Sequence, residues 1–264
     1  MAENKTAVAE GAVEEVKENV EVADKEVVTN PSQADQQVGK VNYELSLEAM
    51  LKAGVHFGHK KAYWNPKMSK YIFGVRNNVH IIDLEKSLDL FKKALKYIEE
   101  LSAKKGMILI VGTKNQAKQL VKQVAEDVNM PYVNDRWLGG TFTNFNFIKN
   151  RIKFLVNNTE ALEAGRLNNL TKLERNKLQK KLARIDSRMG GLIKMTRLPD
   201  AVIVLDINKD IDTVKEAKKV GIKVIGLLDS NSNPDLVDYG IPANDDAVSS
   251  LQYLLGIIAE RIKQ

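Results

Sequence analysis

Apolar residues follow two alternating patterns along this chain. Short continuous apolar runs, typical of strands buried on both faces of a sheet, occur at residues 107–111, 132–133, 201–205 and 223–228. Apolar residues spaced by three and four, typical of amphipathic helices, occur at residues 84–101, 115–128, 212–220 and 247–263. Buried strands that alternate with amphipathic helices favour an α/β fold in which helices cover both faces of a parallel sheet.

Short polar side chains and glycines predict where several helices begin and end. Ser46 is expected to cap a short helix near the start of the patterned region. Asp83 is expected to cap the helix that follows it, and Gly106 to end that helix. Asp245 or Asp246 is expected to cap the last helix of the chain.

Residues 144–195 lack any buried strand and carry two helical apolar stripes instead. The first stripe is Phe145, Ile148, Ile152 and Leu155, and the second is Leu178, Leu182, Ile185, Met189 and Leu192. Thr171 and Glu174 form a capping-box pattern between the two stripes. Two helices joined by a short break predict an antiparallel hairpin. We therefore expect an α/β domain from residues 41–143 and 196–264, with a basic helical hairpin inserted at 144–195.

Residues 1–40 differ in composition from the rest of the chain. They contain nine acidic and four basic residues and no Leu, Ile, Phe, Tyr or Trp. Such a stretch buries too little apolar surface to offset its ordering entropy, so we expect a disordered acidic leader. The alternative is a segment that folds on a basic partner.

Net charge, cysteine content and the length of apolar runs exclude several classes of protein. Residues 149–197 carry thirteen basic and four acidic residues, and the whole chain has a net charge of +6. Such a basic block favours a polyanionic partner. The absence of cysteine excludes a disulfide framework, a thiolate zinc site and a cysteine nucleophile. No apolar run approaches the ~18 residues of a membrane helix, and the acidic start lacks a secretory signal, so we expect a cytoplasmic protein without membrane contact.

Enzyme motifs are poorly represented. The turn Gly112-Thr113-Lys114 follows a strand and opens a helix, where a phosphate can bind, but it has one glycine and matches no nucleotide-binding loop. No nucleophile elbow is present. We therefore expect no catalytic residue, no cofactor and no small-molecule substrate. The alternative is a nucleotide- or Mg²⁺-dependent enzyme that uses Asp206 and Asp229, which follow two buried strands.

Metal ligands are few in the sequence. His56 and His59 would share one face of a helix, but the only further histidine is His80, and a zinc site needs three or four ligands. The carboxylates of Asp206 and Asp229, with Asp245-Asp246 nearby, are interpreted mainly as turn formers and caps. We therefore expect no metal site. The alternative is a metal ion held by Asp206 and Asp229 or by His56 and His59.

The basic segments are better candidates for a binding surface. Between Ala49 and Ile82 there are six basic residues and no acid, interleaved with aromatic residues. Asn77-Asn78 in this region predicts a hairpin turn between strands at 71–76 and 79–83. Basic side chains neutralise phosphates, and aromatic faces stack on unpaired bases. Phe57 and Phe73 are expected to be buried. The loop 136–141 has glycines that permit close approach to a ligand or simply form a tight turn.

These patterns give a set of candidate RNA-contacting residues. The candidates are Lys60, Lys61, Tyr63, Trp64, Lys67, Lys70, Arg76, Arg136, Lys180, Lys181, Arg184 and Arg188. The lysines and arginines would contact phosphates, whereas Tyr63 and Trp64 would stack on bases or brace their loop. The alternative to RNA is an acidic protein partner for the helical hairpin.

Several motifs in order resemble one known family. They are AGVHFGH (53–59), WNPKM (64–68), YIFG (71–74), HIIDL (80–84), RWLGGT (136–141), MGG (189–191), LPD (198–200), DSNSNP (229–234) and NDDA (244–247). Together they resemble the bacterial small-subunit ribosomal protein S2 family over about residues 43–258.

The resemblance implies a flavodoxin-like α/β domain with a protruding coiled-coil hairpin and no catalysis. It also implies a structural role in translation, with binding to small-subunit (16S-type) rRNA. Neighbouring small-subunit ribosomal proteins, including the large one that captures mRNA, are the implied protein partners.

Overall fold

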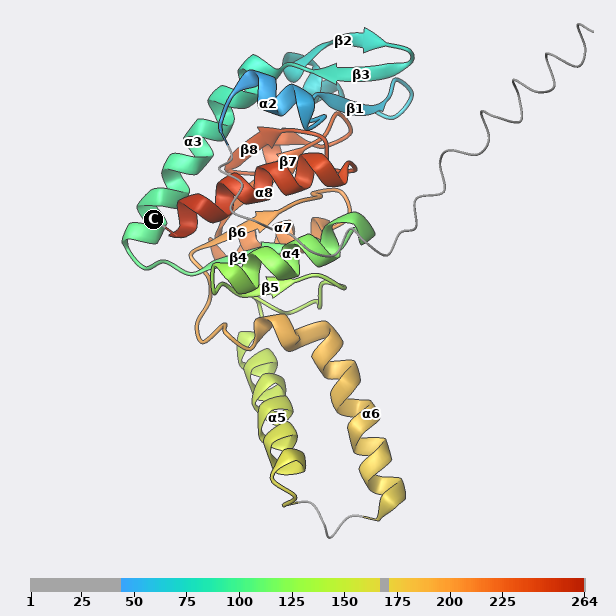
Figure 1. Cartoon of the computed structure of the whole chain (residues 1–264), viewed down its shortest axis with the longest axis vertical. Coiled ribbons are helices and arrows are strands. Elements are labelled where there is room, and N and C mark those ends of the chain that lie inside the picture. Colours follow the sequence, from blue (N-terminus) through green and yellow to red (C-terminus); the bar gives the residue numbers. More distant parts are fainter. Residues whose placement is uncertain (1–43, 167–170, 264) are drawn as a thin grey trace, which may run out of the picture. The chain divides into compact units, whose positions relative to one another are not determined.

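A five-stranded parallel sheet forms the centre of the computed structural model, which describes residues 44–166 and 171–263 (Figure 1). The strands are β4 (Ile108–Val111), β5 (Tyr132–Val133), β6 (Ala201–Val204), β7 (Lys223–Leu228) and β8 (Tyr239–Pro242). Their spatial order is β5-β4-β6-β7-β8, which is the flavodoxin-like order 2-1-3-4-5 when the strands are numbered along the chain. The predicted α/β fold is confirmed. The leader predicted for residues 1–40 lies outside the described residues.

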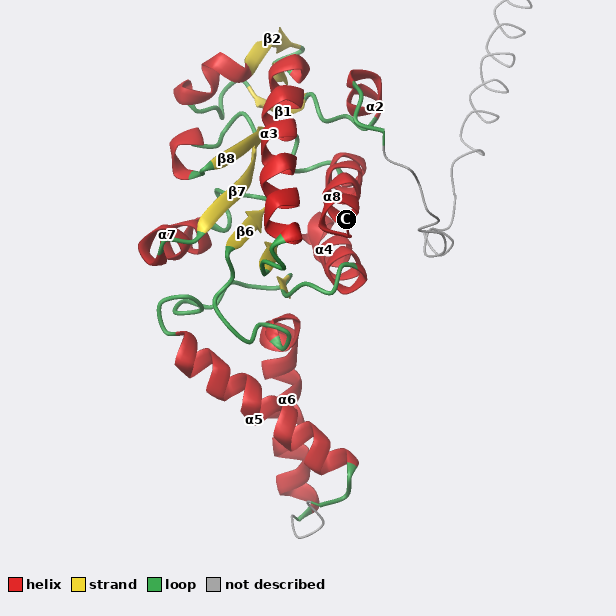
Figure 2. Ribbon diagram, turned by 90° about the vertical axis from the view of Figure 1, so that its left-hand side faces the viewer, coloured by secondary structure: helices red, strands yellow, loops and turns green. Residues whose placement is uncertain are grey.

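Side chains of the strands alternate between two apolar cores. The helices that cover the sheet are α3 (Leu84–Ala103), α4 (Asn115–Asp127), α7 (Ile211–Val220) and α8 (Val248–Lys263). In β4, Ile108 and Ile110 enter the core shared with α3, α4 and α8, whereas Leu109 and Val111 enter the opposite core with α7. Figure 2 shows these helices on the two sides of the sheet. Because both faces are covered, the central strands β4 and β6 are apolar and buried at every position.

Two further helices, α5 (Phe145–Glu163) and α6 (Lys172–Met189), lie between β5 and β6 in the chain. Their predicted apolar stripes are largely buried, and they extend the core that contains α7. The predicted capping box is present, because the Thr171 hydroxyl accepts from the Glu174 N–H and the Glu174 carboxylate accepts from the Thr171 N–H. After α6, Gly191 packs so closely on Tyr132 of β5 that an added Cβ would lie 2.3 Å from its carbonyl oxygen.

A small antiparallel sheet precedes the parallel one in the chain. Its strands are β1 (Phe57–Lys60), β2 (Ile72–Arg76) and β3 (Val79–Ile82), in the order β1-β3-β2. The predicted Asn77-Asn78 turn is present, with φ angles of 49° and 62°. The 3₁₀ helix η1 (Pro66–Tyr71) leads into β2, and the short helix α2 (Leu47–Lys52) is capped by Ser46 as predicted.

Two predicted helix ends are wrong in detail. Helix α3 ends at Ala103, and Lys105 rather than Gly106 takes the left-handed conformation, with φ of 54°. Before α8, the Asn244 side chain accepts hydrogen bonds from the Asp246 and Ala247 N–H groups, and Asp245 does not serve as the cap. The carboxylates of Asp245 and Asp246 bind a lysine instead.

Strands β1 and β8 were not predicted, because their sequences resemble loops. Strand β8 contains Gly240 and Pro242, which are both depleted in strands, and it lies at the edge of the sheet, where proline is tolerated. Strand β1 contains Gly58 and two polar residues in its four positions. Of the helices that the structure describes, none has both the length and the apolar character needed to span a bilayer.

Candidate nucleic-acid interface

Helix α6 carries a strongly basic surface at the β5 end of the parallel sheet (Figure 1). Leu182, Ile185 and Met189 face the core, so the charged positions between them point outward. The predicted contact residues Lys180, Lys181, Arg184 and Arg188 are all exposed on this helix, as is Lys177. Only Glu174 and Asp186 are acidic in α6, and Glu174 is engaged in the capping box. The cations therefore repel one another unless an anion binds them.

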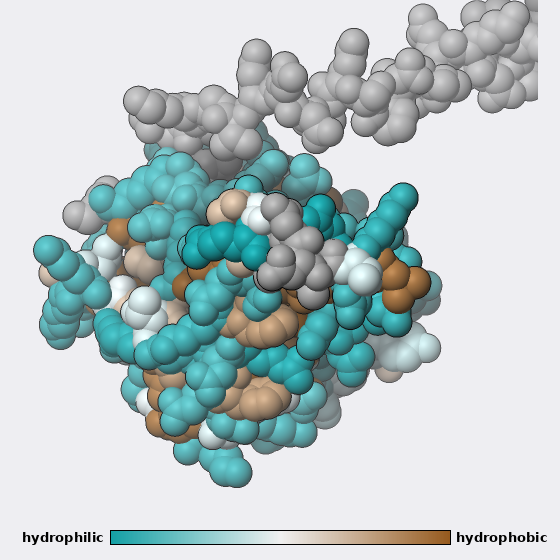
Figure 3. Space-filling view, turned by 90° about the horizontal axis from the view of Figure 1, so that it is seen from below, coloured by the Kyte–Doolittle hydropathy of each residue, from teal (hydrophilic) through white to brown (hydrophobic). Residues whose placement is uncertain are grey.

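A cavity of about 580 Å³ opens between α5 and α6. Its cationic lining residues are Arg151, Lys177, Lys180, Lys181, Arg184 and Arg188, and its apolar lining residues are Leu138, Phe147, Ile148, Ile185 and Met189. Within the described part of the chain, no acidic residue lines it. Figure 3 views the molecule from the far ends of α5 and α6 and shows a mostly hydrophilic face with apolar residues between the polar ones. The cavity therefore combines positive charge with apolar walls.

The loop at residues 136–143 is held in place by the Glu216 carboxylate of α7. This carboxylate accepts hydrogen bonds from the Trp137 indole N–H at 3.3 Å and from the backbone N–H groups of Gly140 and Phe142 at 2.7 and 3.1 Å. Trp137 is buried, and its ring packs edge-on against Phe142 at 4.9 Å. Gly140 adopts a φ of 89°, which a side chain would disfavour. The tight-turn interpretation of the glycines is therefore supported.

Arg136 and Leu138 of the same loop have different surroundings from Trp137. Arg136 is exposed, whereas Leu138 and Gly139 line the cavity between α5 and α6. The loop thus contributes to the same surface as the basic helix α6. The predicted contact residues of the loop and of α6 are brought to one end of the sheet, beside β5.

The other predicted contact residues form a separate surface. Lys60, Lys61, Tyr63, Trp64, Lys67, Lys70 and Arg76 are all exposed on and around the small antiparallel sheet. This segment is attached to the loop after β7, because the Asn65 N–H donates to the Ser230 carbonyl at 2.8 Å. Figures 1 and 2 both show the small sheet at the β8 end of the parallel sheet and α5 and α6 at the β5 end. The structure therefore separates the candidates into two groups.

Within the second group, three residues have side-chain partners inside the chain. The Lys67 ammonium pairs with the exposed carboxylate of Asp235, and the Lys70 ammonium lies 4.9 Å from the centroid of the Tyr71 ring. The Trp64 ring lies 5.2 Å from the buried His80 ring, so Trp64 also braces its loop. Tyr63 is the most exposed aromatic residue of this loop, at 68%.

The prediction that Phe57 and Phe73 are buried is wrong. Phe57 is 48% exposed and Phe73 is 82% exposed. The small sheet is covered on one face only, so alternate side chains of its strands remain in solvent. These two rings, together with Leu51 and Val75, line a second cavity of about 720 Å³. The small sheet therefore presents an apolar surface beside its basic residues.

The carboxyl ends of the parallel strands, where ligands bind in open α/β sheets, are filled by a charged cluster. The Lys114 ammonium lies 3.0 Å from Asp206, 2.7 Å from Asp245 and 2.7 Å from Asp246. His59 adds its two ring nitrogens, at 3.0 Å from Asp229 and 3.4 Å from Asp246. The predicted placement of Asp206 and Asp229 at this edge is confirmed, and the chain itself supplies their cation.

Titration in this cluster is strongly perturbed. Burial and the neighbouring carboxylates of Asp229 and Asp206 raise the pKa of Asp245 to about 7. Burial alone would lower the pKa of Lys114, but the combined attraction of the surrounding carboxylates, Asp245 foremost, raises it. The hydrogen bond to Asp229 raises the pKa of His59 against the opposing effect of burial. Each shift reflects an excess of carboxylates around few cations.

The same cluster offers atoms that can ligate a metal ion. One ligand atom from each of His59, Asp229, Asp245 and Asp246 lies within 4.8 Å of the others. His59 lies in strand β1, not on the helix considered for the His56–His59 pair, and it meets carboxylates from two other loops. The convergence of the aspartates was expected from their places after the strands, but no spacing in the sequence relates His59 to them.

Gly112, in the turn that precedes Lys114, serves packing. An added Cβ would lie 2.8 Å from both Leu205 and Val121. Glycine at this position lets α4 approach the sheet, which supports the packing interpretation over a phosphate-binding turn.

Three residues of the α5–α6 surface are not among the predicted RNA-contacting residues. Phe147 and Arg151 of α5 and Lys177 of α6 line the cavity. A signal was available, because Phe147, Arg151 and Phe154 have the helical spacing of four and three and lie one residue before the buried stripe. Such a neighbouring stripe lies at the edge of the buried face.

Comparison with known proteins is consistent with these features. Residues 50–264 match the model of the family described as ribosomal protein S2. Two relatives, each named small ribosomal subunit protein uS2, come from Francisella tularensis subsp. novicida (strain U112) and subsp. tularensis (strain WY96-3418). Each is 44% identical over 216 residues, covering 82% of this chain and 90% of the relative. The chain therefore belongs to the ribosomal protein S2 family.

Proposed function

We propose that this protein is a structural constituent of the small ribosomal subunit that binds folded small-subunit (16S-type) rRNA through its basic surfaces. The observation that carries the proposal is the unbalanced row of exposed cations on α6, beside a cavity that no acidic residue of the described chain lines. Phosphate groups would relieve the repulsion within this row and release counterions. The names of the relatives, which are small-subunit proteins, support the same assignment.

Membership of a structural, non-enzymatic family confirms the prediction that the chain is not an enzyme. The charged cluster at the carboxyl edge agrees with this, because Lys114 and His59 fill the position that a nucleotide would take in a flavodoxin-like enzyme. We expect the protein in the cytoplasm, on the ribosome.

A second part of the proposal concerns neighbouring ribosomal proteins. The apolar surface of the small sheet, with Phe57, Phe73, Leu51 and Val75 exposed, has the character of a protein-docking surface. We propose that it receives neighbouring small-subunit proteins, including the large one that captures mRNA. The basic residues of that sheet would then contact rRNA beside the docked protein.

Salt-dependent binding to small-subunit rRNA tests the main proposal. The logarithm of the binding constant should fall linearly with the logarithm of salt concentration, by about 0.7–0.9 for each neutralised phosphate. The double substitution Arg184→Gln/Arg188→Gln should weaken binding and reduce this slope by about 1.5. The matched control Lys92→Gln/Lys96→Gln removes two exposed charges with the same spacing from α3.

Two results would overturn the proposal. One is rRNA binding that does not depend on salt, and the other is an equal loss of slope in both double variants. Sedimentation separates the alternative of an acidic protein partner. The protein should sediment with small subunits and be released from them by nuclease. An assembly that stays intact after nuclease treatment would favour the alternative.

A further inference from the structure

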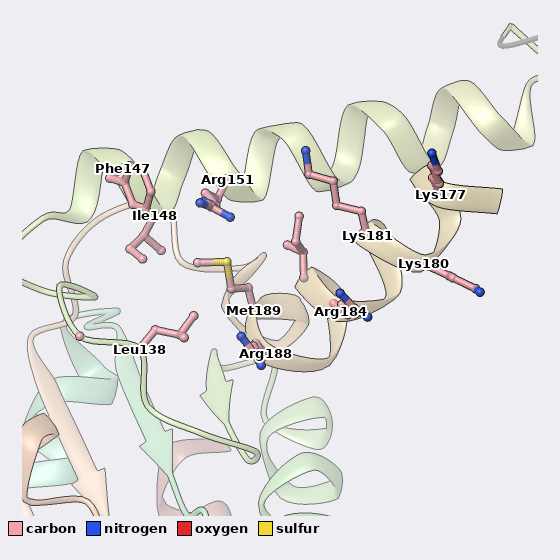
Figure 4. A pocket seen from close by; sticks show the side chains of 12 residues that line it. Leu138, Phe147, Ile148, Arg151, Lys177, Lys180, Lys181, Arg184, Arg188 and Met189 are labelled. Carbon is pink, nitrogen blue, oxygen red and sulfur yellow. The ribbon is translucent and has the colours of Figure 1, made fainter. Parts of the chain in front are cut away.

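The cavity between α5 and α6 is more than a charged surface, because aromatic and apolar side chains form its walls. Phe147 is 50% exposed, and the Arg151 guanidinium lies 4.9 Å from the centroid of its ring. Figure 4 shows Phe147, Ile148 and Arg151 on α5 above Met189 of α6 and Leu138 of the loop, all of which line the cavity. A volume of about 580 Å³ lies within the range of pockets that hold small organic groups.

The charged groups around this cavity are all hydrogen-bond donors. Lysine and arginine side chains donate and cannot accept, and Met189 offers only a weak acceptor. The Leu138 carbonyl of the neighbouring loop already accepts from the Thr141 N–H and hydroxyl. A group that enters the cavity must therefore present acceptors to these donors.

The walls limit the occupant further. A free phosphate would use the cations and leave the apolar walls and the exposed Phe147 ring in contact with water. A planar group with an acceptor-rich edge uses both, since it stacks on the ring or on the stacked guanidinium and accepts from arginine. Guanine presents two adjacent acceptors on one edge, O6 and N7, which match an arginine fork, whereas adenine places a donor beside N7.

We propose that this cavity binds one unstacked guanine of a single-stranded rRNA segment, with the flanking phosphates on Arg184, Arg188 and Lys181. The proposal rests on the proposed function, because it names the part of the rRNA that α5 and α6 receive. Unpaired, splayed-out bases are the usual targets of sequence-specific RNA recognition. The Lys181 ammonium, 4.9 Å from the Phe154 ring, joins the two helices at the side of the cavity.

Gly139 provides a test that keeps every cation in place. It lines the cavity, and an added Cβ would meet no heavy atom within 4 Å. Gly139→Trp should therefore fill the cavity without disturbing the fold. Gln123→Trp is the matched control, because Gln123 is an exposed, uncharged residue of α4 that belongs to neither candidate surface. Phe147→Ala removes the stacking surface from an exposed position.

The measurement is the binding of the full chain to a labelled nine-nucleotide strand of uridine with one guanosine at its centre. The probes for comparison are the same strand with central adenosine and the paired duplex of the guanosine strand. The guanosine strand should bind about tenfold more tightly than the adenosine strand. Gly139→Trp and Phe147→Ala should each lower its affinity about tenfold, leave the salt slope unchanged and have little effect on the duplex. Gln123→Trp should bind as the parent does, and thermal unfolding confirms that all variants are folded.

The results that overturn this inference differ from those that overturn the proposed function. Equal binding of the guanosine and adenosine strands, or unchanged affinity in Gly139→Trp and Phe147→Ala, would refute the base site while salt-dependent rRNA binding persists. A polyglutamate peptide provides a further comparison. If Gly139→Trp lowers the affinity for this peptide but leaves the affinity for the guanosine strand unchanged, the cavity belongs to an acidic protein segment. If the unaltered chain binds none of these RNAs, the proposed function itself is refuted.

Discussion

Replacing Lys114 by methionine removes the ammonium that lies among three carboxylates while keeping most of the apolar stem. In the structure this ammonium contacts Asp206, Asp245 and Asp246 at 2.7–3.0 Å and is only 16% exposed. At an effective dielectric constant of about 20, each such contact contributes about 5 kcal/mol before desolvation is subtracted. Desolvation offsets most of this, and breaking a buried pair by removing one partner typically costs about 3–5 kcal/mol. We expect Lys114→Met to lower the free energy of unfolding by that amount.

The loss should also depend on pH, because Asp245 titrates near neutrality. Its pKa in the folded state is about 7, against 3.8 for an ordinary aspartate, so folding retains a proton that the unfolded chain releases. Between these two values this group therefore reduces stability as the pH rises. Without the ammonium the folded pKa of Asp245 moves higher still. The window then extends above pH 7, and the difference from the parent grows by up to about 1.4 kcal/mol per pH unit.

Urea unfolding of both chains at pH 6 and pH 8.5 measures this directly. The matched control is Lys118→Met on the same helix, whose exposed pair with Asp135 at 2.9 Å should contribute less than about 1 kcal/mol. A loss in Lys114→Met no larger than in this control would refute the argument. So would a loss that is identical at the two pH values.

Three further variants each test one contact that stabilises the fold. Glu216→Ala should lower stability by about 3 kcal/mol, because it leaves the N–H donors of the loop at 136–143 without their acceptor. Gly191→Ala should cost about 1–3 kcal/mol, since its Cβ would overlap the backbone of Tyr132, and both losses are measurable by thermal or urea unfolding. Asp200→Asn should flatten the acid limb of the stability profile. The hydrogen bonds from Arg197 lower the pKa of Asp200, so its contribution is present above 3.8 and is lost as the pH falls through the lower folded value.

Each of these variants has its own contrary result. Unchanged stability in Glu216→Ala would mean that water replaces the carboxylate without loss. A stable Gly191→Ala variant would mean that the turn after α6 shifts freely away from β5. An Asp200→Asn variant with the same acid unfolding profile as the parent would assign the acid sensitivity to other carboxylates.

Local features of the fold were readable from the sequence because short-range physics determines them. The stripes of α5 and α6, the Asn77-Asn78 turn, the Asp83 cap and the Thr171 capping box involve residues within four positions of one another. Continuous apolar runs predict buried parallel strands. These signals were sufficient to predict the α/β class.

The features that were missed depend on contacts between distant segments. Phe57 and Phe73 look like core residues, and only the packing of the small sheet decides that their face stays open. Strand β8 is defined by pairing with β7, not by its own composition. His59 meets Asp229 across 170 positions of sequence, so no spacing rule relates them.

The placement of the charged cluster explains why binding would move to the edges of this fold. In a flavodoxin-like sheet the carboxyl ends of the strands at the switch point between β4 and β6 normally receive the ligand. Here Lys114 follows β4 and binds the aspartate that follows β6, so an internal ion pair closes that position. The exposed cations instead lie on α6 beside β5 and on the small sheet beside β8. The proposed binding of a large polyanion would therefore use two surfaces at opposite edges of one sheet.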